Sequence, residues 1–149
     1  MKALETREES LLSTAPFSGV LRLPPTNSLV PTRGTILLIY GFVLSAHAYR
    51  ELASLWCVAG WAVYVPAAVY SVCTSVGDEL PAVISAGTWA RKNLPHPTIL
   101  AGHSRGGQAV LNLMLQLTKG PVTTLPLAFS GRQTYLDFQP FFNIYVTRA

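Results

Sequence analysis

Three short apolar runs dominate the pattern of hydrophobic and polar positions along this chain. They cover residues 34–40, 61–65 and 98–101, and each has glycine or proline at its borders. Runs of this length between turn-forming residues are typical of strands that are buried on both faces. We therefore expect three strands in the interior of one sheet.

Helical spacing separates these runs. Segment 46–58 carries apolar residues on one helical face, namely Tyr49, Leu52, Ala53 and Trp56. A second helix is expected at 80–93, with Asp78 as its cap, and a third at 106–117, apolar around most of its circumference. Alternation of strands and helices predicts an α/β fold with a parallel central sheet and flanking crossover helices.

The two ends of the chain are less clearly patterned. Residues 1–33 contain four prolines and predict an irregular segment, with room for a short strand at 19–23. We assign residues 34–149 to one partial α/β domain, in which a further strand is expected at 124–129 or at 135–138. The sheet predicted in this way is incomplete at both ends.

Composition supports a folded domain. The chain has 149 residues, of which 50% are hydrophobic and 12% charged, so a buried core is expected rather than disorder. The net charge is +4, but the basic residues are scattered. Nucleic-acid binding needs clustered cations, so we expect no nucleic-acid partner. The sequence leaves the oligomeric state open.

Cysteine and histidine positions bear on metal and redox chemistry. Cys57 and Cys73 both lie in apolar stretches, so we expect buried free thiols. His47, His96 and His103 are scattered and show no metal-ligand spacing. We therefore predict no metal and no other cofactor.

One window of the chain raises a membrane alternative. Residues 52–77 carry no charge, and a bilayer-spanning helix needs about 20 apolar residues. Gly60 and Pro66 interrupt the window, so we favour a helix end followed by a strand. Residues 1–18 contain three glutamates and no apolar core of a signal peptide, so we expect no secretion. A plastid or the cytoplasm remains compatible with the sequence, as does peripheral membrane contact.

The strongest chemical signal is the heptapeptide Ala-Gly-His-Ser-Arg-Gly-Gly at 101–107. It contains the G-x-S-x-G pattern centred on Ser104 and lies between an expected strand and an expected helix. That context predicts a nucleophile elbow, a sharp turn that exposes the serine hydroxyl above a sheet. Small residues such as Gly102 and Gly106 let the following helix pack close to the strand.

Together with Tyr40-Gly41-Phe42 and Gly60 to Pro66, this motif resembles the α/β-hydrolase family. The longer string Gly102-His103-Ser104-Arg105-Gly106-Gly107 is similar to the lipase motif of chlorophyllases, which hydrolyse the phytyl ester of chlorophyll to chlorophyllide and phytol. The resemblance extends from about Gly34 to Gln116. It implies a carboxylic-ester hydrolase of chlorophyll catabolism that acts on a hydrophobic ester such as chlorophyll.

The resemblance also assigns roles. Ser104 would attack the ester carbonyl and form an acyl-enzyme. The backbone N–H groups of Arg105 and Phe42 would form the oxyanion hole. Asp137 is the only acid after Ser104, and it is the candidate for the acid of the triad. No histidine follows His103, whose position beside the nucleophile predicts a structural role, so the position of the base is unfilled.

Three alternatives to this interpretation remain open. The chain could be another lipase or esterase, whose elbows are similar. It could be a non-catalytic binding or regulatory module that keeps a hydrophobic cleft. It could also be a gene-model fragment, a splice product or a degenerate relative of the family.

Overall fold

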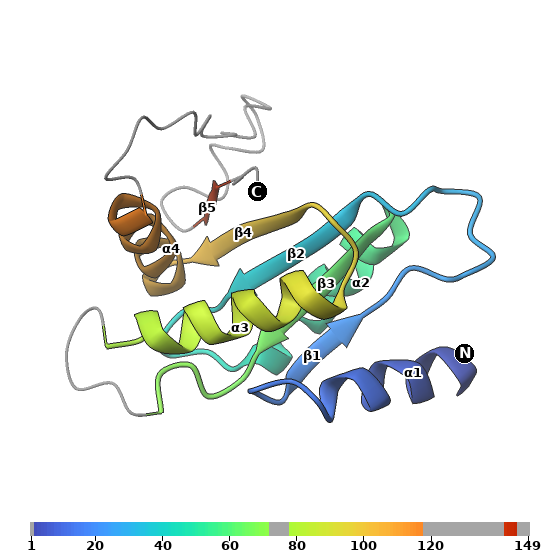
Figure 1. The fold of residues 1–149 in the computed structure, drawn as a ribbon, viewed down its shortest axis with the longest axis horizontal. Helices are drawn as coiled ribbons and strands as arrows, with labels where there is room; N and C mark the ends of the chain where they lie inside the picture. Colours follow the sequence, from blue (N-terminus) through green and yellow to red (C-terminus); the bar gives the residue numbers. More distant parts are fainter. Residues whose placement is uncertain (1, 72–77, 118–141, 146–149) are drawn as a thin grey trace.

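The computed structural model describes residues 2–71, 78–117 and 142–145. Its five-stranded sheet has the order β1-β3-β2-β4-β5 (Figure 1). The strands are β1 (Gly19–Arg22), β2 (Gly34–Ile39), β3 (Trp61–Pro66), β4 (Thr98–His103) and β5 (Phe142–Tyr145). Strands β3, β2 and β4 are parallel, whereas β1 and β5 pair antiparallel at the two edges. The sheet is mixed, and with its flanking helices it makes the fold α/β.

The apolar runs form the middle of the sheet, as the sequence predicts. Ile36 of β2 is in register with Val63 of β3 on one side and with Ile99 of β4 on the other. Every residue of β2 is buried. A parallel strand with helices over both faces has no face that needs polar side chains, and this explains the continuous apolar run.

The direction of each crossover determines which face of the sheet its helix covers. The chain passes from β2 to β3 on one side, then back across β2 to β4. Right-handed connections in opposite directions place their helices on opposite faces. Thus α2 (Arg50–Val58), entered through the 3₁₀ helix η1 (Ala46–Tyr49), lies behind the sheet in Figure 1, and α3 (Leu80–Asn93) lies in front.

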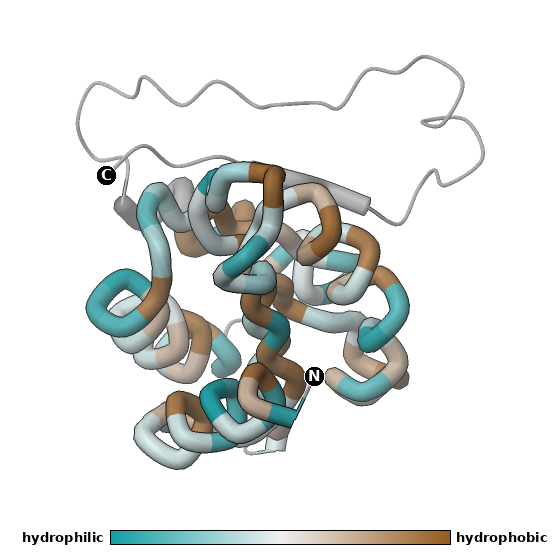
Figure 2. The backbone as a smooth tube through the Cα atoms, turned by 90° about the vertical axis from the view of Figure 1, so that its right-hand side faces the viewer, coloured by the Kyte–Doolittle hydropathy of each residue, from teal (hydrophilic) through white to brown (hydrophobic). Residues whose placement is uncertain are grey.

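Helix α4 (Arg105–Leu117) packs against α3 and against β4. Along the helices, polar and apolar residues alternate in the tube view, as expected for helices with one face on the core (Figure 2).

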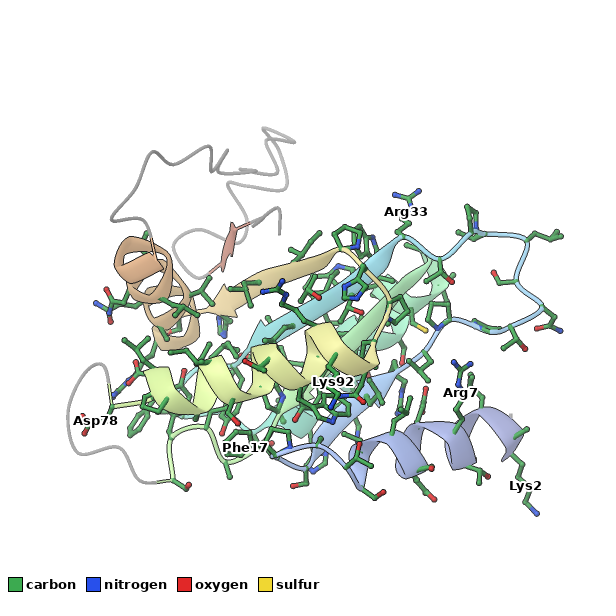
Figure 3. The ribbon with its side chains drawn as sticks, viewed as in Figure 1. Lys2, Arg7, Phe17, Arg33, Asp78 and Lys92 are labelled. Atoms are coloured by element: carbon green, nitrogen blue, oxygen red, sulfur yellow. The ribbon has the colours of Figure 1, made fainter. Side chains whose placement is uncertain are left out.

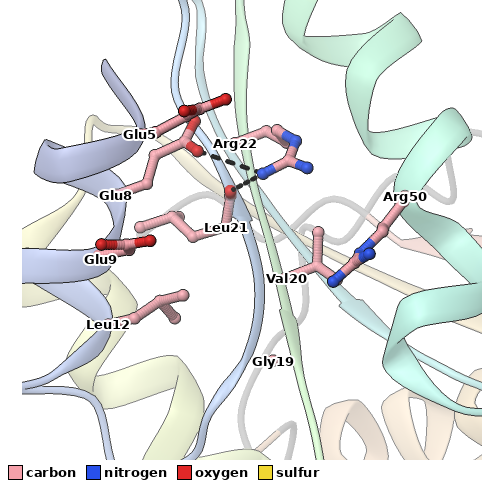
Figure 4. Close-up of a pocket in the computed structure, with 9 residues that line it drawn as sticks. All are labelled: Glu5, Glu8, Glu9, Leu12, Gly19, Val20, Leu21, Arg22 and Arg50. Carbon is pink, nitrogen blue, oxygen red and sulfur yellow. Dashed lines mark hydrogen bonds and ion pairs between the residues drawn. The ribbon is translucent and has the colours of Figure 1, made fainter. Parts of the chain in front are cut away.

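Residues 2–12, for which the pattern predicts no element, form α1 (Lys2–Leu12) against the edge strand β1. The contact depends on Glu8, which is only 5% exposed. Its carboxylate accepts a hydrogen bond from the Leu23 backbone N–H at 2.9 Å and lies 3.2 Å from Arg22 Nη1. Figure 4 shows this ion pair in the pocket between α1, β1 and Arg50 of α2. The helix thus satisfies a backbone donor just beyond the end of β1.

The start of α3 differs from the prediction. Its N-cap residue is Glu79 rather than Asp78, and the Glu79 side chain makes no capping hydrogen bond. The Glu79 carboxylate instead faces Arg105, an ion pair that a local sequence pattern cannot reveal.

Several other predictions can be placed on the structure. Cys57 is a buried free thiol, whereas Cys73, Asp137 and both candidate strands at 124–129 and 135–138 lie outside the described residues. Within the described ranges, no helix is long and apolar enough to cross a membrane. Among the exposed cations, Lys2 and Arg7 project from α1, Arg33 lies just before β2, and Lys92 lies near the end of α3 (Figure 3).

Candidate active site

Ser104 occupies the single-residue turn between β4, which ends at His103, and α4, which begins at Arg105. Its φ of 53° lies in the left-handed region, and its side chain is exposed. Residues other than glycine adopt this conformation at a cost of about 1–2 kcal/mol, and such strain clusters at functional sites. The strand, the strained turn and the helix expected around Ser104 are all present.

Close backbone packing explains the glycines of the motif. A Cβ at Gly102 would overlap the backbone of Gly106. A Cβ at Gly106 would overlap the Ile39 carbonyl group and lie 2.7 Å from the Tyr40 carbonyl oxygen. The first turn of α4, which also contains the buried Gly107, is therefore pressed against the end of β2.

The loop after β2 lies directly beside the elbow. A Cβ at Gly41 would be 3.4 Å from Ser104 Cβ and 3.1 Å from His103 Nδ1. In the strand order, the chain runs from β2 to its neighbour β3 in one direction, whereas from β4 it runs through α4 to β5 in the opposite direction. In open α/β sheets, ligands bind at the carboxyl ends of strands where connections diverge in this way. The sequence-predicted Phe42 and Ser104 are brought to that point.

His103 takes part in a hydrogen-bond network inside the loop. The Gly41 N–H donates to Tyr49 Oη at 3.1 Å, and Tyr49 Oη lies 2.6 Å from His103 Nδ1. The Tyr49 hydroxyl thus links the backbone of Gly41 to the ring of His103. Burial lowers the pKa of His103, which favours the neutral ring. This supports the structural role expected for His103.

The Arg105 side chain bridges three segments. Its Nη2 atom lies 3.3 Å from Oε2 of Glu79, which is fully buried. Its guanidinium carbon lies 4.8 Å from the Phe42 ring centroid and 5.4 Å from that of Tyr70. The Tyr70 hydroxyl in turn donates to the Tyr40 carbonyl oxygen at 2.6 Å.

Three residues at this site, Tyr49, Tyr70 and Glu79, were not predicted as site residues from the sequence. The partners that bring them to the site lie 8 to 54 residues away along the chain, and nothing in their local pattern marks them.

An apolar rim follows Gly41, the residue that lies against Ser104. Phe42, Val43 and Leu44 form this rim in the loop after β2 and are 53%, 90% and 42% exposed. Three consecutive exposed apolar residues are a candidate surface for a hydrophobic ligand.

The remaining candidates do not join this site. His96 precedes β4 and so lies at the amino end of the strand whose carboxyl end carries Ser104. His47 is exposed in η1. In the part of the chain that the structure describes, His, Cys, Asp and Glu side chains form no cluster that could hold a metal ion.

Comparisons with protein-family models, with curated proteins and with solved structures found no significant match to this chain.

Proposed function

We propose that this chain is a serine hydrolase of carboxylic esters with an α/β-hydrolase-like fold and Ser104 as its nucleophile. The observation that carries the proposal is the conformation of Ser104, which is exposed at a φ of 53° on the turn between β4 and α4. This is the arrangement that presents a serine hydroxyl above the carboxyl edge of a sheet.

The proposed reaction uses the two loops that meet at this point. The Ser104 oxygen attacks the ester carbonyl carbon, the alcohol leaves, and water then releases the acid from the acyl-enzyme. Backbone N–H groups of Arg105 and Phe42 stabilise the oxyanion, and losing one such donor typically costs about 3–4 kcal/mol of transition-state stabilisation. Gly41, whose Cα faces Ser104 without a side chain, leaves room for the carbonyl.

The apolar rim suggests the substrate class. A long hydrocarbon chain, such as the phytyl group of chlorophyll, would cover Phe42, Val43 and Leu44 and be removed from water there. The proposal therefore extends to a chlorophyllase-like ester, with chlorophyllide and phytol as products. Other lipids with a hydrophobic alcohol or acyl chain share this chemistry.

The incomplete triad limits the expected rate of ester hydrolysis. Asp137 remains the proposed acid. The position of the base stays unfilled, because no histidine follows Ser104 in the sequence. A serine without a base is a weak nucleophile, but an oxyanion hole and substrate binding alone retain about 10³–10⁴-fold catalysis over water.

Hydrolysis of p-nitrophenyl esters tests the proposal. We expect slow turnover that is lost in Ser104→Ala and kept in Ser54→Ala, a matched change on the exposed side of α2. A longer acyl chain should lower KM, and Val43→Ser should raise it. Equal hydrolysis by the wild type and Ser104→Ala would refute the assignment.

A second candidate is a non-catalytic module that binds a hydrophobic ligand. The exposed apolar residues Phe42, Val43 and Leu44 favour it, because they offer a surface for a hydrocarbon chain whether or not the serine reacts. This candidate predicts phytol binding that is unchanged in Ser104→Ala and weakened in Val43→Ser. Ester turnover that depends on Ser104 would exclude it.

A further inference from the structure

We infer that the Arg105 side chain is a positioning residue, which holds the loop of residues 40–42 against the elbow by stacking on Phe42 while Glu79 anchors its other end. This inference rests on the proposed function, since the loop matters for catalysis only if it supplies an oxyanion donor. Arg105 thereby has two separate roles, with its backbone N–H as one donor and its side chain as the support of the other.

The stacking geometry supports this role. Arg105 follows Ser104 directly, so the strained turn fixes where its side chain begins. The guanidinium lies near two aromatic rings, those of Phe42 at 4.8 Å and Tyr70 at 5.4 Å. The two rings also meet edge to face at 5.6 Å. A planar cation near the faces of aromatic rings is attracted to both, and lysine cannot reproduce the planar contact.

The anchor is a buried carboxylate. Glu79 is fully buried, and it directs its side chain to Arg105 instead of capping α3. A buried charge is tolerated when a partner and hydrogen bonds compensate it, so removing either member of the pair is strongly unfavourable. The Arg105 side chain is therefore held at the site rather than free to turn toward solvent.

Each residue of the loop is held by a different element. The Tyr70 hydroxyl donates to the Tyr40 carbonyl, and the Gly41 N–H donates to the Tyr49 hydroxyl. Arg105 supplies the corresponding contact at Phe42. The contact at Phe42 comes from Arg105, the residue that directly follows the nucleophile and carries the other proposed donor. It thus couples the position of one proposed donor to the other.

The kinetic consequence differs from that of a binding residue. A donor misplaced by a fraction of an ångström weakens the transition state more than the bound ester. With a short-chain ester, which does not depend on the apolar rim, loss of the stack should therefore lower kcat and leave KM nearly unchanged. Loss of substrate binding would do the reverse.

Two readouts on the full chain test the inference. The first is amide hydrogen exchange of residues 40–44, which reports on the loop whether or not the chain is an enzyme. The second is the p-nitrophenyl ester kinetics. For Arg105→Lys and Arg105→Gln we expect exchange about tenfold faster in this loop, and kcat reduced about tenfold or more with KM within about twofold.

The control is Arg91→Lys, a change at an exposed arginine of α3, which should alter neither readout. Glu79→Gln keeps the shape of the anchor and removes its charge, so it should speed loop exchange and lower kcat as the Arg105 variants do. If Arg105→Gln does not fold, Glu79→Gln tests the inference in its place. Unchanged loop exchange in all three variants would overturn the inference, as would an effect confined to KM. Absence of Ser104-dependent turnover in the wild type would refute the proposed function, and the exchange measurements would still decide how the loop is held.

Discussion

Replacing Ser104 with glycine and with alanine separates backbone strain from loss of the hydroxyl. Both variants remove the nucleophile, and they differ only by a methyl group. Ser104 has a φ of 53°, a conformation that glycine adopts freely and alanine does not. We therefore expect Ser104→Gly to be the more stable of the two variants.

The magnitude follows from two opposing terms. The left-handed conformation costs about 1–2 kcal/mol for alanine and nothing for glycine. Glycine loses more backbone entropy on folding, which offsets about 0.5–1 kcal/mol of that advantage. The free energy of unfolding of Ser104→Gly should exceed that of Ser104→Ala by about 1 kcal/mol, which corresponds to a Tm difference of about 2–4 °C in a chain of this size.

Urea denaturation monitored by circular dichroism measures the difference, provided that both variants have the same m-value. The matched control is Ser54 in the middle of α2, where the backbone is helical and the side chain is exposed. There the order should reverse, and glycine should be about 1 kcal/mol less stable than alanine. If glycine is also the less stable variant at Ser104, the turn is not strained and the elbow interpretation fails.

Three further predictions concern stability. Gly106→Ala should lower the free energy of unfolding by about 3 kcal/mol, because its Cβ would overlap backbone atoms. Gly87→Ala in α3 should instead raise it by about 0.5–1 kcal/mol, because its Cβ would lie 3.7 Å from the nearest side chain and alanine favours a helix. His103 has a pKa below its ordinary value of 6.5, so the unfolded chain binds more protons, and stability should fall as pH drops from 6.5 through that lowered pKa. His103→Asn, which keeps a polar side chain but cannot titrate, should lack this fall. Glu8→Ala should cost about 1–3 kcal/mol and Glu9→Ala less than about 0.5 kcal/mol, since only the first leaves a backbone donor unpaired.

Denaturation curves check all three, with pH profiles from 8 to 5 for His103. Equal effects at Gly106 and Gly87 would contradict the close packing of α4 on β2. Parallel pH profiles for the wild type and His103→Asn would show that the ring does not titrate differently on unfolding. A neutral Glu8→Ala would remove the reason given for the docking of α1.

The centre of the fold could be predicted from sequence because its cause is local. Strands β2, β3 and β4 are buried on both faces, so each leaves a continuous apolar run between turn residues. The elbow was predictable for the same reason. Its tight turn requires glycine at positions 102 and 106, and these glycines form part of a short sequence motif around Ser104.

The rest depends on partners that are distant in the sequence. Helix α1 has one buried position, which Glu8 occupies, and Leu4, Leu11 and Leu12 are only partly buried. The helix therefore lacks the strong apolar stripe that would have predicted it. The tyrosines that hold the loop lie 8 and 30 residues from Gly41 and Tyr40, and Glu79 lies 26 residues before Arg105. Side chains that meet only after folding leave no local pattern in the sequence. The residues that hold the loop and Arg105 in place could therefore be found only in the structure.

The most direct test of the central claim is to react the folded chain with a fluorophosphonate and locate the adduct by peptide mass spectrometry. Imidazole added in solution supplies a base, since no histidine follows Ser104 in the sequence. The account predicts a single adduct on Ser104 that forms faster as imidazole increases, and that is lost in the urea-unfolded chain. An adduct spread over several serines, or Ser104 labelling that is no faster in the folded chain than in the unfolded one, would contradict it.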